Sequence, residues 1–271
     1  MILKSIQSKS KIMQAACGCH IGKKRGNNED NFYFDGKFMD SDNTGLAEIL
    51  TKQISRLEGI LDGYHFYAVF DGMGGGSYGE IASNLSAAAA KRFFEDENNM
   101  NLCDITPSLT QLCQNMNADV FQTGQNLGAY QMGSTIVSLF FYAGQVWVCN
   151  LGDSRCYRLR RAKMKRLSVD HTDEADVKAH GITGRKPYLT QYLGIDPEEM
   201  RIEPHIKSYP VENGDRFLLC SDGLTDMVSE QEICNMLAKY GSPEDCVKYL
   251  MGAALENGGR DNITIIVCQI G

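Results

Sequence analysis

The chain of 271 residues is 43% hydrophobic and 23% charged, which is ordinary for a globular protein with a sizeable core. Its formal net charge of −7 argues against nucleic acid or an anionic membrane surface as its main partner. No run of about 18 apolar residues occurs, so no transmembrane helix is predicted. Several of the ten cysteines lie in apolar runs, which indicates reduced thiols and a cytoplasmic protein.

The first part of the chain is expected to begin with a strand over Met13–His20. A polar, turn-like stretch follows over Gly22–Asp30, and an apolar run resumes over Asn31–Phe34. This pattern predicts a β-hairpin with a charged tip. Between Leu46 and Leu61 apolar residues recur at helical spacing, which predicts a short amphipathic helix.

The most informative stretch is Tyr67–Gly76, which reads YAVFDGMGGG. An apolar strand is predicted to carry Asp71 at its end, followed by a glycine cluster. A carboxylate at a strand end, beside backbone that permits close approach, suits a metal ion or a phosphate. Two helices are predicted next, over Ile81–Phe94 and Pro107–Gln122.

The remaining elements are expected to be hairpins, paired helices and one long loop. They are strands over Met132–Tyr142 and Gln145–Asn150, a hairpin of Cys156–Leu159 with Met164–Leu167, a flap over Asp170–Gly194, a strand over Arg216–Cys220, helices over Glu230–Lys239 and Pro243–Glu256, and a central strand over Ile263–Ile270. Successive hairpins and helix pairs favour antiparallel sheets covered by helices over a doubly wound parallel sheet. We expect a single domain over residues 1–271.

Five acidic motifs each place an aspartate in a turn beside an apolar strand. They are Glu29-Asp30, Asp71-Gly72, Gly152-Asp153-Ser154, Asp222-Gly223 and Asp261-Asn262. One such aspartate usually has only a local role, because its side chain accepts hydrogen bonds from its own backbone. If the fold brings five of them together, their repulsion requires cations.

The ligand types favour Mg²⁺ or Mn²⁺ over zinc, because oxygen donors dominate and no His or Cys pair has coordinating spacing. Two such ions can activate water and hold an anionic substrate, so hydrolysis of a phosphate ester is the predicted reaction. Arg25 lies five residues before Asp30. Its planar guanidinium suits a phosphate, which it can bind through two parallel hydrogen bonds.

An ordered series of motifs resembles the metal-dependent protein phosphatase family, of the protein phosphatase 2C type in its bacterial form. The motifs are Arg25-Gly-Asn-Asn-Glu-Asp30, Phe70-Asp-Gly-Met-Gly-Gly75, Met132-Gly-Ser-Thr135, Asn150-Leu-Gly-Asp-Ser-Arg155, Leu219-Cys-Ser-Asp-Gly-Leu224 and Gly259-Arg-Asp-Asn-Ile-Thr264. Each is weak alone, but six in this order are specific. The resemblance spans about residues 15–267.

The resemblance implies an α+β fold, a four-layer α-β-β-α sandwich of two packed antiparallel sheets flanked by helix pairs. It implies hydrolysis of phosphoserine and phosphothreonine in phosphorylated proteins, by a water activated by two Mn²⁺ or Mg²⁺ ions and without a phosphoenzyme. We expect no nucleic-acid or membrane partner and a monomer.

By motif, the resemblance assigns Asp71 to bridge the two metal ions and the Gly72 carbonyl to bind one of them. Asp222 and Asp261 would bind the other ion. Arg25 would hold the substrate phosphate. These assignments make Arg25, Asp71, Asp222 and Asp261 the catalytic set.

Other residues receive supporting roles from the same resemblance. Glu29 and Asp30 would act largely through metal-bound waters. Asp153 and Asp226 resemble residues that hold a weaker third ion in family members. Asn262 would support the site from behind the metal ligands.

The sequence departs from parts of the family in three places. Met73 stands where many eukaryotic members have a histidine proposed as general acid, and methionine cannot donate a proton. The flap at residues 170–194 is short, and residues 36–63 resemble an insertion beside the site. Both differences bear on substrate choice.

Two other interpretations compete with a phosphatase. Gly74–Gly79 fits the G-x-G-x-x-G pattern of a nucleotide-binding module, but Asp71 would repel a pyrophosphate and no second parallel strand follows the helix. A non-catalytic relative that only binds phosphoproteins is the other alternative. Such a protein would be expected to lose metal ligands, whereas every carboxylate of the pattern is present here.

Overall fold

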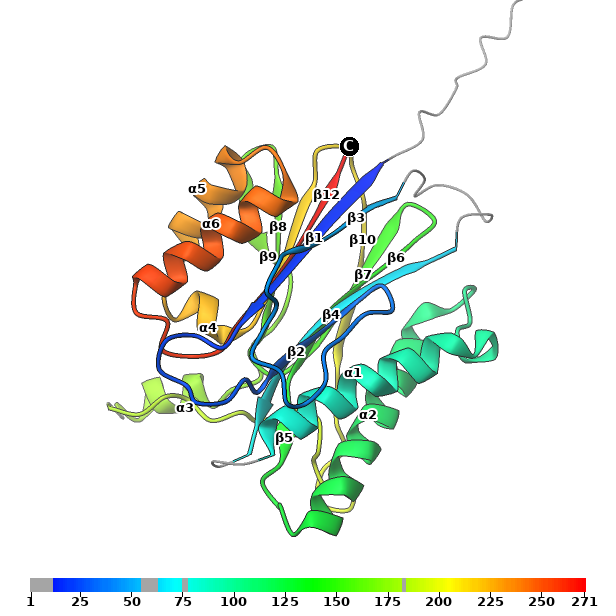
Figure 1. The fold of residues 1–271 in the computed structure, drawn as a ribbon. Helices are drawn as coiled ribbons and strands as arrows, with labels where there is room; N and C mark the ends of the chain where they lie inside the picture. Colours follow the sequence, from blue (N-terminus) through cyan, green and yellow to red (C-terminus); the bar gives the residue numbers. More distant parts are fainter. Residues whose placement is uncertain (1–11, 55–62, 75–77, 182–183) are drawn as a thin grey trace, which may run out of the picture.

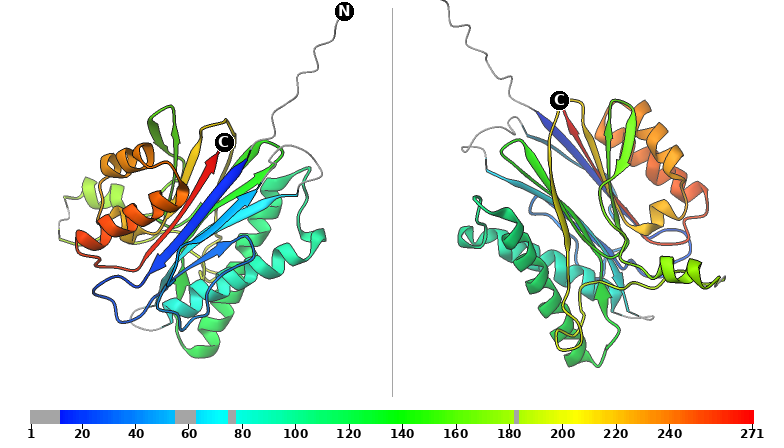
Figure 2. Two further views of the ribbon diagram at one scale, coloured as in Figure 1. Left: turned by 45° about the horizontal axis from the view of Figure 1, so that its top comes forward. Right: turned by 180° about the vertical axis from the view of Figure 1, so that it is seen from behind.

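The computed structural model describes residues 12–54, 63–74, 78–181 and 184–271. Within these residues two antiparallel sheets pack face to face, and a pair of long helices covers the outer face of each sheet (Figure 1). Figure 2 shows the same layers from two further sides. The predicted four-layer sandwich is confirmed.

The first sheet holds the N-terminal and C-terminal strands side by side at its centre. Its order is β3 (Leu50–Ile54), β1 (Met13–His20), β12 (Ile263–Ile270), β11 (Arg216–Cys220), β8 (Arg155–Arg160) and β9 (Lys163–Arg166). Every neighbouring pair is antiparallel. β12 lies between β1 and β11, as its apolar sequence predicted.

The second sheet is also antiparallel and centres on β4 and β6. Its order is β10 (His205–Pro210), β7 (Gln145–Leu151), β6 (Ile136–Tyr142), β4 (His65–Met73) and β2 (Asp30–Phe34), and the short β5 (Gly133–Ser134) pairs with the end of β4. Both neighbours of β4 run antiparallel to it. None of the described strands pairs with β4 in parallel, so the described topology lacks the parallel strand pair that a nucleotide-binding module requires.

The helices form two outer layers and a few short connections. They are α1 (Gly79–Glu95), α2 (Ile105–Leu127), α3 (Glu174–Ala179), α4 (Asp222–Thr225), α5 (Glu230–Lys239) and α6 (Pro243–Glu256), with a 3₁₀ turn η1 at Glu97–Asn99. α1 and α2 cover the second sheet, and α5 and α6 cover the first (Figure 1). None of the described helices is both long and apolar enough to cross a membrane.

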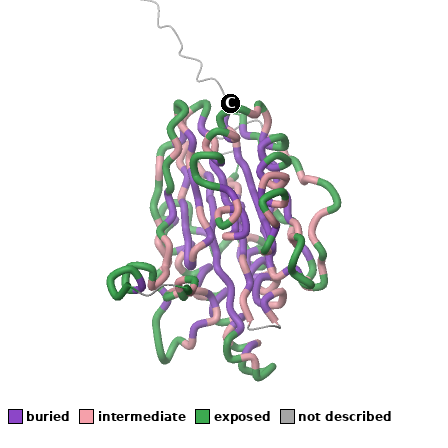
Figure 3. The backbone as a smooth tube through the Cα atoms, turned by 90° about the vertical axis from the view of Figure 1, so that its left-hand side faces the viewer, coloured by how far each residue is buried: buried purple, intermediate pink, exposed green. Residues whose placement is uncertain are grey.

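Strand β4 is apolar on both faces because each face meets a different layer. Tyr67 and Val69 belong to the core between the two sheets. Phe66, Ala68 and Phe70 belong to the core beneath α1 and α2. Figure 3 shows the buried strands in the middle of the molecule, with exposed segments around them. Burial on both sides holds the end of β4, and therefore Asp71, in a rigid setting.

The expected hairpin between residues 13–20 and 31–34 is wrong. β1 pairs with β12 and β3 in the first sheet, whereas β2 pairs with β4 in the second. The polar stretch 22–30 therefore crosses from one sheet to the other. Alternating apolar residues specify that a strand has a buried face, but they do not specify the sheet that it joins.

The expected helix between Leu46 and Leu61 is also wrong over Leu50–Ile54. These residues form the edge strand β3, whose burial alternates along the strand, and Leu50 and Ile54 pack against the core between the sheets. Pairing with β1 outweighs the helical spacing of the apolar residues. Residues 55–62 of the expected helix lie outside the described residues.

Both of the later hairpins are confirmed, with two-residue turns. Ala143 and Gly144 join β6 to β7 with φ of 47° and 74°. Arg161 and Ala162 join β8 to β9 with φ of 50° and 60°. Positive φ at both central residues is the turn geometry that matches the twist of paired strands.

All ten cysteines are free thiols, and most are buried, as predicted.

Candidate functional site

A cavity of about 680 Å³ lies where β4 ends, and charged residues from both sheets line it. Its charged lining residues are Arg25, Glu29, Asp71, Asp153, Lys186, Asp222 and Asp261. Gly72 and Met73 also line it. The structure therefore brings most of the sequence-predicted site residues to one place.

Asp71 and Asp30 come from neighbouring strands of the second sheet and are direct cross-strand partners. The Asp71 backbone is held by Thr135, whose N–H donates to the Asp71 carbonyl at 2.8 Å and whose Oγ1 accepts from the Asp71 N–H at 3.1 Å. Asp30 lies deeper and is 1% exposed. Its carboxylate accepts a hydrogen bond from Ser221 Oγ at 2.7 Å.

Only glycine fits at position 72. A Cβ there would lie 2.0 Å from the carbonyl oxygen of Gly79 and 2.6 Å from that of Glu29. The Gly72 N–H also donates to the Glu29 carbonyl at 3.0 Å. The close approach packs the end of β4 between the start of α1 and the crossing loop 22–30.

Asp222 and Asp261 lie beside strand ends of the first sheet. Asp222 is the first residue of α4 and is separated from the end of β11 by Ser221, and Asp261 lies two residues before β12. The two loops pack closely, because a Cβ on Gly223 would lie 1.9 Å from the Asn262 carbonyl oxygen. Glycine at position 223 thus permits Asp222 and Asp261 to share one rim of the cavity.

Asn262 is buried and fastens the crossing loop to the start of β12. Its Oδ1 accepts from the Glu29 N–H at 2.8 Å. Its Nδ2 donates to the carbonyls of Ile21 and Asn27 at 2.8 and 2.9 Å. All three contacts hold backbone rather than a carboxylate, so Asn262 positions Glu29 and the loop that carries Arg25.

Arg25 reaches across the cavity mouth to two carboxylates. Its Nη2 donates to Asp261 at 2.7 Å, and its Nη1 lies 3.4 Å from Glu29. The Arg25 side chain is 45% exposed. An exposed guanidinium on the rim of a cavity is accessible to an anionic ligand.

The carboxylates raise one another's pKa values. Burial, and then the charges of Asp222 and Asp30, raise the pKa of Asp71 well above its ordinary value. Burial raises the pKa of Asp30 to about 7, although the hydrogen bond from Ser221 opposes the rise. Burial and the charge of Asp222 raise the pKa of Asp153 to about 6. Such a cluster favours bound cations.

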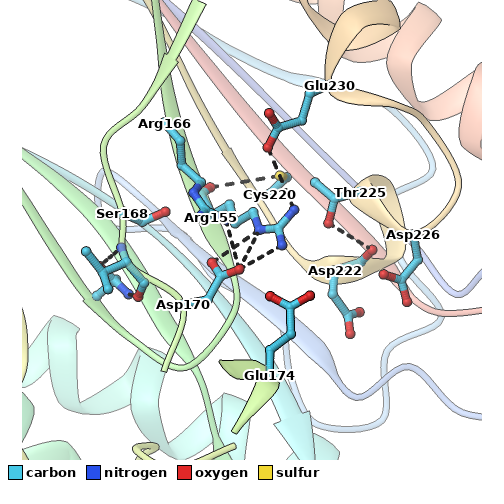
Figure 4. A network of polar contacts seen from close by, with 12 residues as sticks. Arg155, Arg166, Ser168, Asp170, Glu174, Cys220, Asp222, Thr225, Asp226 and Glu230 are labelled. Carbon is cyan, nitrogen blue, oxygen red and sulfur yellow. Dashed lines mark hydrogen bonds and ion pairs between the residues drawn. The ribbon is translucent and has the colours of Figure 1, made fainter. Parts of the chain in front are cut away.

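A second hollow of about 200 Å³ adjoins the cavity, and Asp153, Asp222 and Asp226 all line it. Figure 4 shows Asp222 and Asp226 extending from α4 and its C-terminal end, opposite the Arg155–Asp170 pair. Lys186 Nζ forms ion pairs with both Asp222 and Asp226. Burial alone would lower the pKa of Lys186, but the negative charge of Asp222 outweighs this effect and raises the pKa.

The donor chemistry of the cavity suits a hard divalent cation, because partly buried carboxylates line it and its described lining residues supply neither a thiolate nor an imidazole. Among the described residues, however, no three Asp, Glu, His or Cys side chains are arranged as a ready metal site. Asp222 and Asp261 instead bind the side-chain cations of Lys186 and Arg25. The carboxylates are thus the type of ligand that a divalent cation requires, and in this structure two of them bind the positively charged side chains of Lys186 and Arg25.

A model of the family described as protein phosphatase 2C matches residues 58–257, well over half of the chain. The chain belongs to the protein phosphatase 2C family. The serine/threonine protein phosphatase PstP of Mycobacterium tuberculosis is 29% identical over 222 residues, which cover 79% of this chain and 42% of that protein. The chain thus spans less than half the length of the mycobacterial relative.

Two further comparisons cover nearly all of the chain. The serine/threonine phosphatase Stp of Listeria monocytogenes is 27% identical over 261 residues, which cover 92% of each protein. A solved structure of the PstP catalytic domain in complex with two manganese ions is 26% identical, with a TM-score of 0.72, and the match covers 96% of this chain and 99% of that one. The likeness to a protein phosphatase 2C extends to the whole described fold.

Sequence reasoning missed several residues of this protein phosphatase 2C site. Thr135 and Ser221 stand inside two of the motifs, but nothing local showed that they bind Asp71 and Asp30. Lys186 lies in the polar flap, where no periodicity marks one lysine among others. Tyr130 and Tyr188 line the cavity and are 78% and 66% exposed. Only the folded chain places them there.

Proposed function

We propose that this protein is a metal-dependent phosphatase that hydrolyses phosphoserine and phosphothreonine in proteins. The observation that carries the proposal is the cavity itself, where partly buried carboxylates from the strand ends of both sheets meet beside an accessible arginine. Membership of the protein phosphatase 2C family supports it, as do the serine/threonine phosphatases among the relatives.

The carboxylates have the roles of metal ligands in this proposal. Asp71, Asp222, Asp261 and the Gly72 carbonyl would hold two Mn²⁺ or Mg²⁺ ions, as the two manganese ions of the PstP structure suggest by analogy. Such ions supply Lewis-acid activation of water and stabilise negative charge on phosphorus-bound oxygens. Glu29 and Asp30 would bind waters at the edge of this centre.

Arg25 would bind the phosphate of the substrate through its guanidinium, and that contact orients the phosphorus for in-line attack. Met73 lines the cavity but has no proton to donate, so the leaving oxygen must take its proton from solvent or from another side chain. Asp153 and Asp226 would hold a weaker third ion in the adjoining hollow. Asn262 would keep the Arg25 loop in place.

We also propose that residues 1–271 act as one catalytic domain, in signalling by protein phosphorylation and in the cytoplasm. The free thiols of all ten cysteines support a reducing compartment.

An assay of phosphate release from phosphothreonine and phosphotyrosine peptides tests the proposed activity. We expect release from the phosphothreonine peptide with Mn²⁺ and none with EDTA, and much slower release from the phosphotyrosine peptide. Full activity in EDTA would refute the metal requirement. Tight peptide binding without phosphate release in saturating Mn²⁺ would instead identify a non-catalytic phosphoprotein-binding relative.

Substitution of Arg25 is expected to act mainly on substrate binding. Arg25→Ala removes both phosphate contacts and should raise KM about tenfold or more, with a smaller fall in kcat. Arg25→Lys keeps the charge but not the two parallel donors, so it should restore only part of the loss. Steady-state kinetics on one phosphopeptide measure both parameters.

Arg161→Ala is the matched control for charge. Arg161 is 84% exposed in the β8–β9 turn and pairs with Glu212 at 3.2 Å, and it does not line the cavity. Its KM should equal that of the wild type. An unchanged KM in Arg25→Ala would show that another group binds the phosphate.

A further inference from the structure

The flap carries a lysine into the carboxylate site. Lys186 Nζ makes a close ion pair with Asp222 and a second one, at 3.1 Å, with Asp226. The Asp222 side chain is only 14% exposed, whereas the Lys186 side chain is 54% exposed. The ammonium thus approaches from the solvent side and neutralises charge at a carboxylate that has little water around it.

The flap holds Lys186 in this position through contacts at its base. Thr172 and Leu189 form a β-bridge, and the Tyr188 N–H donates to Asp173 Oδ1 at 2.7 Å. Arg185, next to Lys186, binds Asp173 at 2.6 Å and lies over the Tyr188 ring at 4.2 Å. Lys186 therefore projects from a loop whose two sides are fastened together, and its approach to Asp222 is part of the fold.

The contact matters for any cation that binds Asp222. In the proposed function, on which this inference rests, Asp222 is a metal ligand. An ammonium and a divalent ion at the same carboxylate would lie a few ångströms apart and repel each other strongly in a partly buried site. Metal binding at Asp222 must therefore displace Lys186. Because the ion pairs of Lys186 have to be broken, the net free energy of metal binding is less favourable by the free energy of those ion pairs.

We propose that Lys186 is a tethered competitor for the metal site, which weakens metal binding at Asp222 and leaves the carboxylates when the ion binds. The lysine takes the place of a cation in the metal-free protein and relieves part of the repulsion within the cluster. Metal binding then releases one end of the flap, beside the cavity where a phosphopeptide would bind. The affinity for metal and the position of the flap are thus linked, and thermodynamic linkage makes the effect reciprocal.

Titration of the substrate-free protein with Mn²⁺ tests the competition, with free Mn²⁺ followed by its electron paramagnetic resonance signal. Lys186→Met keeps the length of the side chain and removes its charge, and it should lower the Kd for the Asp222-bound ion by about tenfold or more. Lys186→Arg keeps the charge and should bind Mn²⁺ nearly as weakly as the wild type.

Lys178→Met is the matched control, because it removes one positive charge from the same flap. Lys178 lies in α3 and pairs with Glu174 at 2.8 Å. Its Kd for Mn²⁺ should equal that of the wild type. Equal Kd values in wild type and Lys186→Met would overturn the inference and leave the proposed function intact. Failure of every variant to bind Mn²⁺ would overturn both.

Chemical labelling of lysines provides a second measurement, on the wild-type chain. Acetic anhydride should acetylate Lys186 slowly in EDTA and several times faster in saturating Mn²⁺, because metal binding releases the amine from its ion pairs. Lys178 should react at the same rate in both conditions. Mass spectrometry of the peptides measures both sites. Equal labelling of Lys186 with and without Mn²⁺ would show that the lysine is not displaced, and would refute the inference.

Discussion

Asp71→Asn is expected to abolish metal-dependent phosphate release and, at the same time, to raise the melting temperature of the metal-free protein. The activity should fall by about a thousandfold or more, because the substitution removes the carboxylate proposed to bridge the ions. The stability should rise because Asp71 is buried among Asp30, Asp222 and Asp153, whose charges disfavour its ionised form. Each kcal/mol of relieved repulsion raises the melting temperature by about 2–4 °C.

Thermal denaturation in EDTA and phosphopeptide turnover in Mn²⁺ measure the two effects. Asp215→Asn is the control, because Asp215 is also shielded from solvent, at 0% exposure, but is neutralised by Arg160 at 2.6 Å. That variant should keep kcat and lose stability, since Arg160 loses one of its carboxylate partners and keeps Glu212, at 2.7 Å. Retained activity in Asp71→Asn, or a fall in its melting temperature like that of the control, would contradict the assignment of Asp71.

A rise in pH from about 4 to about 7 is expected to lower the free energy of unfolding of the metal-free protein, because Asp30 resists ionisation in the folded state. An unfolded aspartate loses its proton near pH 4, whereas folded Asp30 has a pKa of about 7. Between these values the folded state binds more protons, so the free energy of unfolding falls as pH rises. The stability is fully present below pH 4 and is lost as the pH passes 7. For a carboxyl this buried, the contribution is on the order of 4 kcal/mol.

The difference between wild type and Asp30→Asn isolates this contribution from the other carboxylates of the protein. Urea denaturation in EDTA at several pH values should show the variant gaining on the wild type as the pH rises, with the gain levelling off above pH 7. Saturating Mn²⁺ should make the wild type as stable as the variant at high pH, because the bound ions then compensate the negative charge of the ionised Asp30 carboxylate. A difference that does not change with pH would show that Asp30 is ionised without penalty.

The parts of the fold that sequence predicted well are those with local signals at both ends. Helices α5 and α6 were predicted to the residue, and each begins at a serine cap, Ser229 or Ser242, with Pro243 in the first turn of α6. The turns of the two later hairpins were visible as short interruptions between apolar runs. The acidic motifs stood out because aspartate at the end of an apolar strand is a local pattern.

The failures have a common cause, which is that pairing partners are distant in sequence. Leu50–Ile54 became an edge strand because β1 was available to pair with it. The loop 22–30 changes sheets because β1 and β2 find different partners. Lys186 reaches Asp222 across 36 positions of the chain, and no local pattern specifies that contact. The cavity's carboxylates were therefore foreseeable, whereas the cations that they bind in the structure were not.

The position of the proposed metal ligands at the ends of two different sheets has a mechanical consequence. Asp30 and Asp71 belong to one sheet, and Asp222 and Asp261 lie near strand ends of the other. Ions bound between them would therefore cross-link the two sheets at one end. The distance between the two sheets is set by the hydrophobic core between them, where the ring centroids of Phe141 and Phe217 from opposite sheets lie 5.6 Å apart. The hydrophobic interior would thus act as a spacer that sets the width of the proposed metal centre.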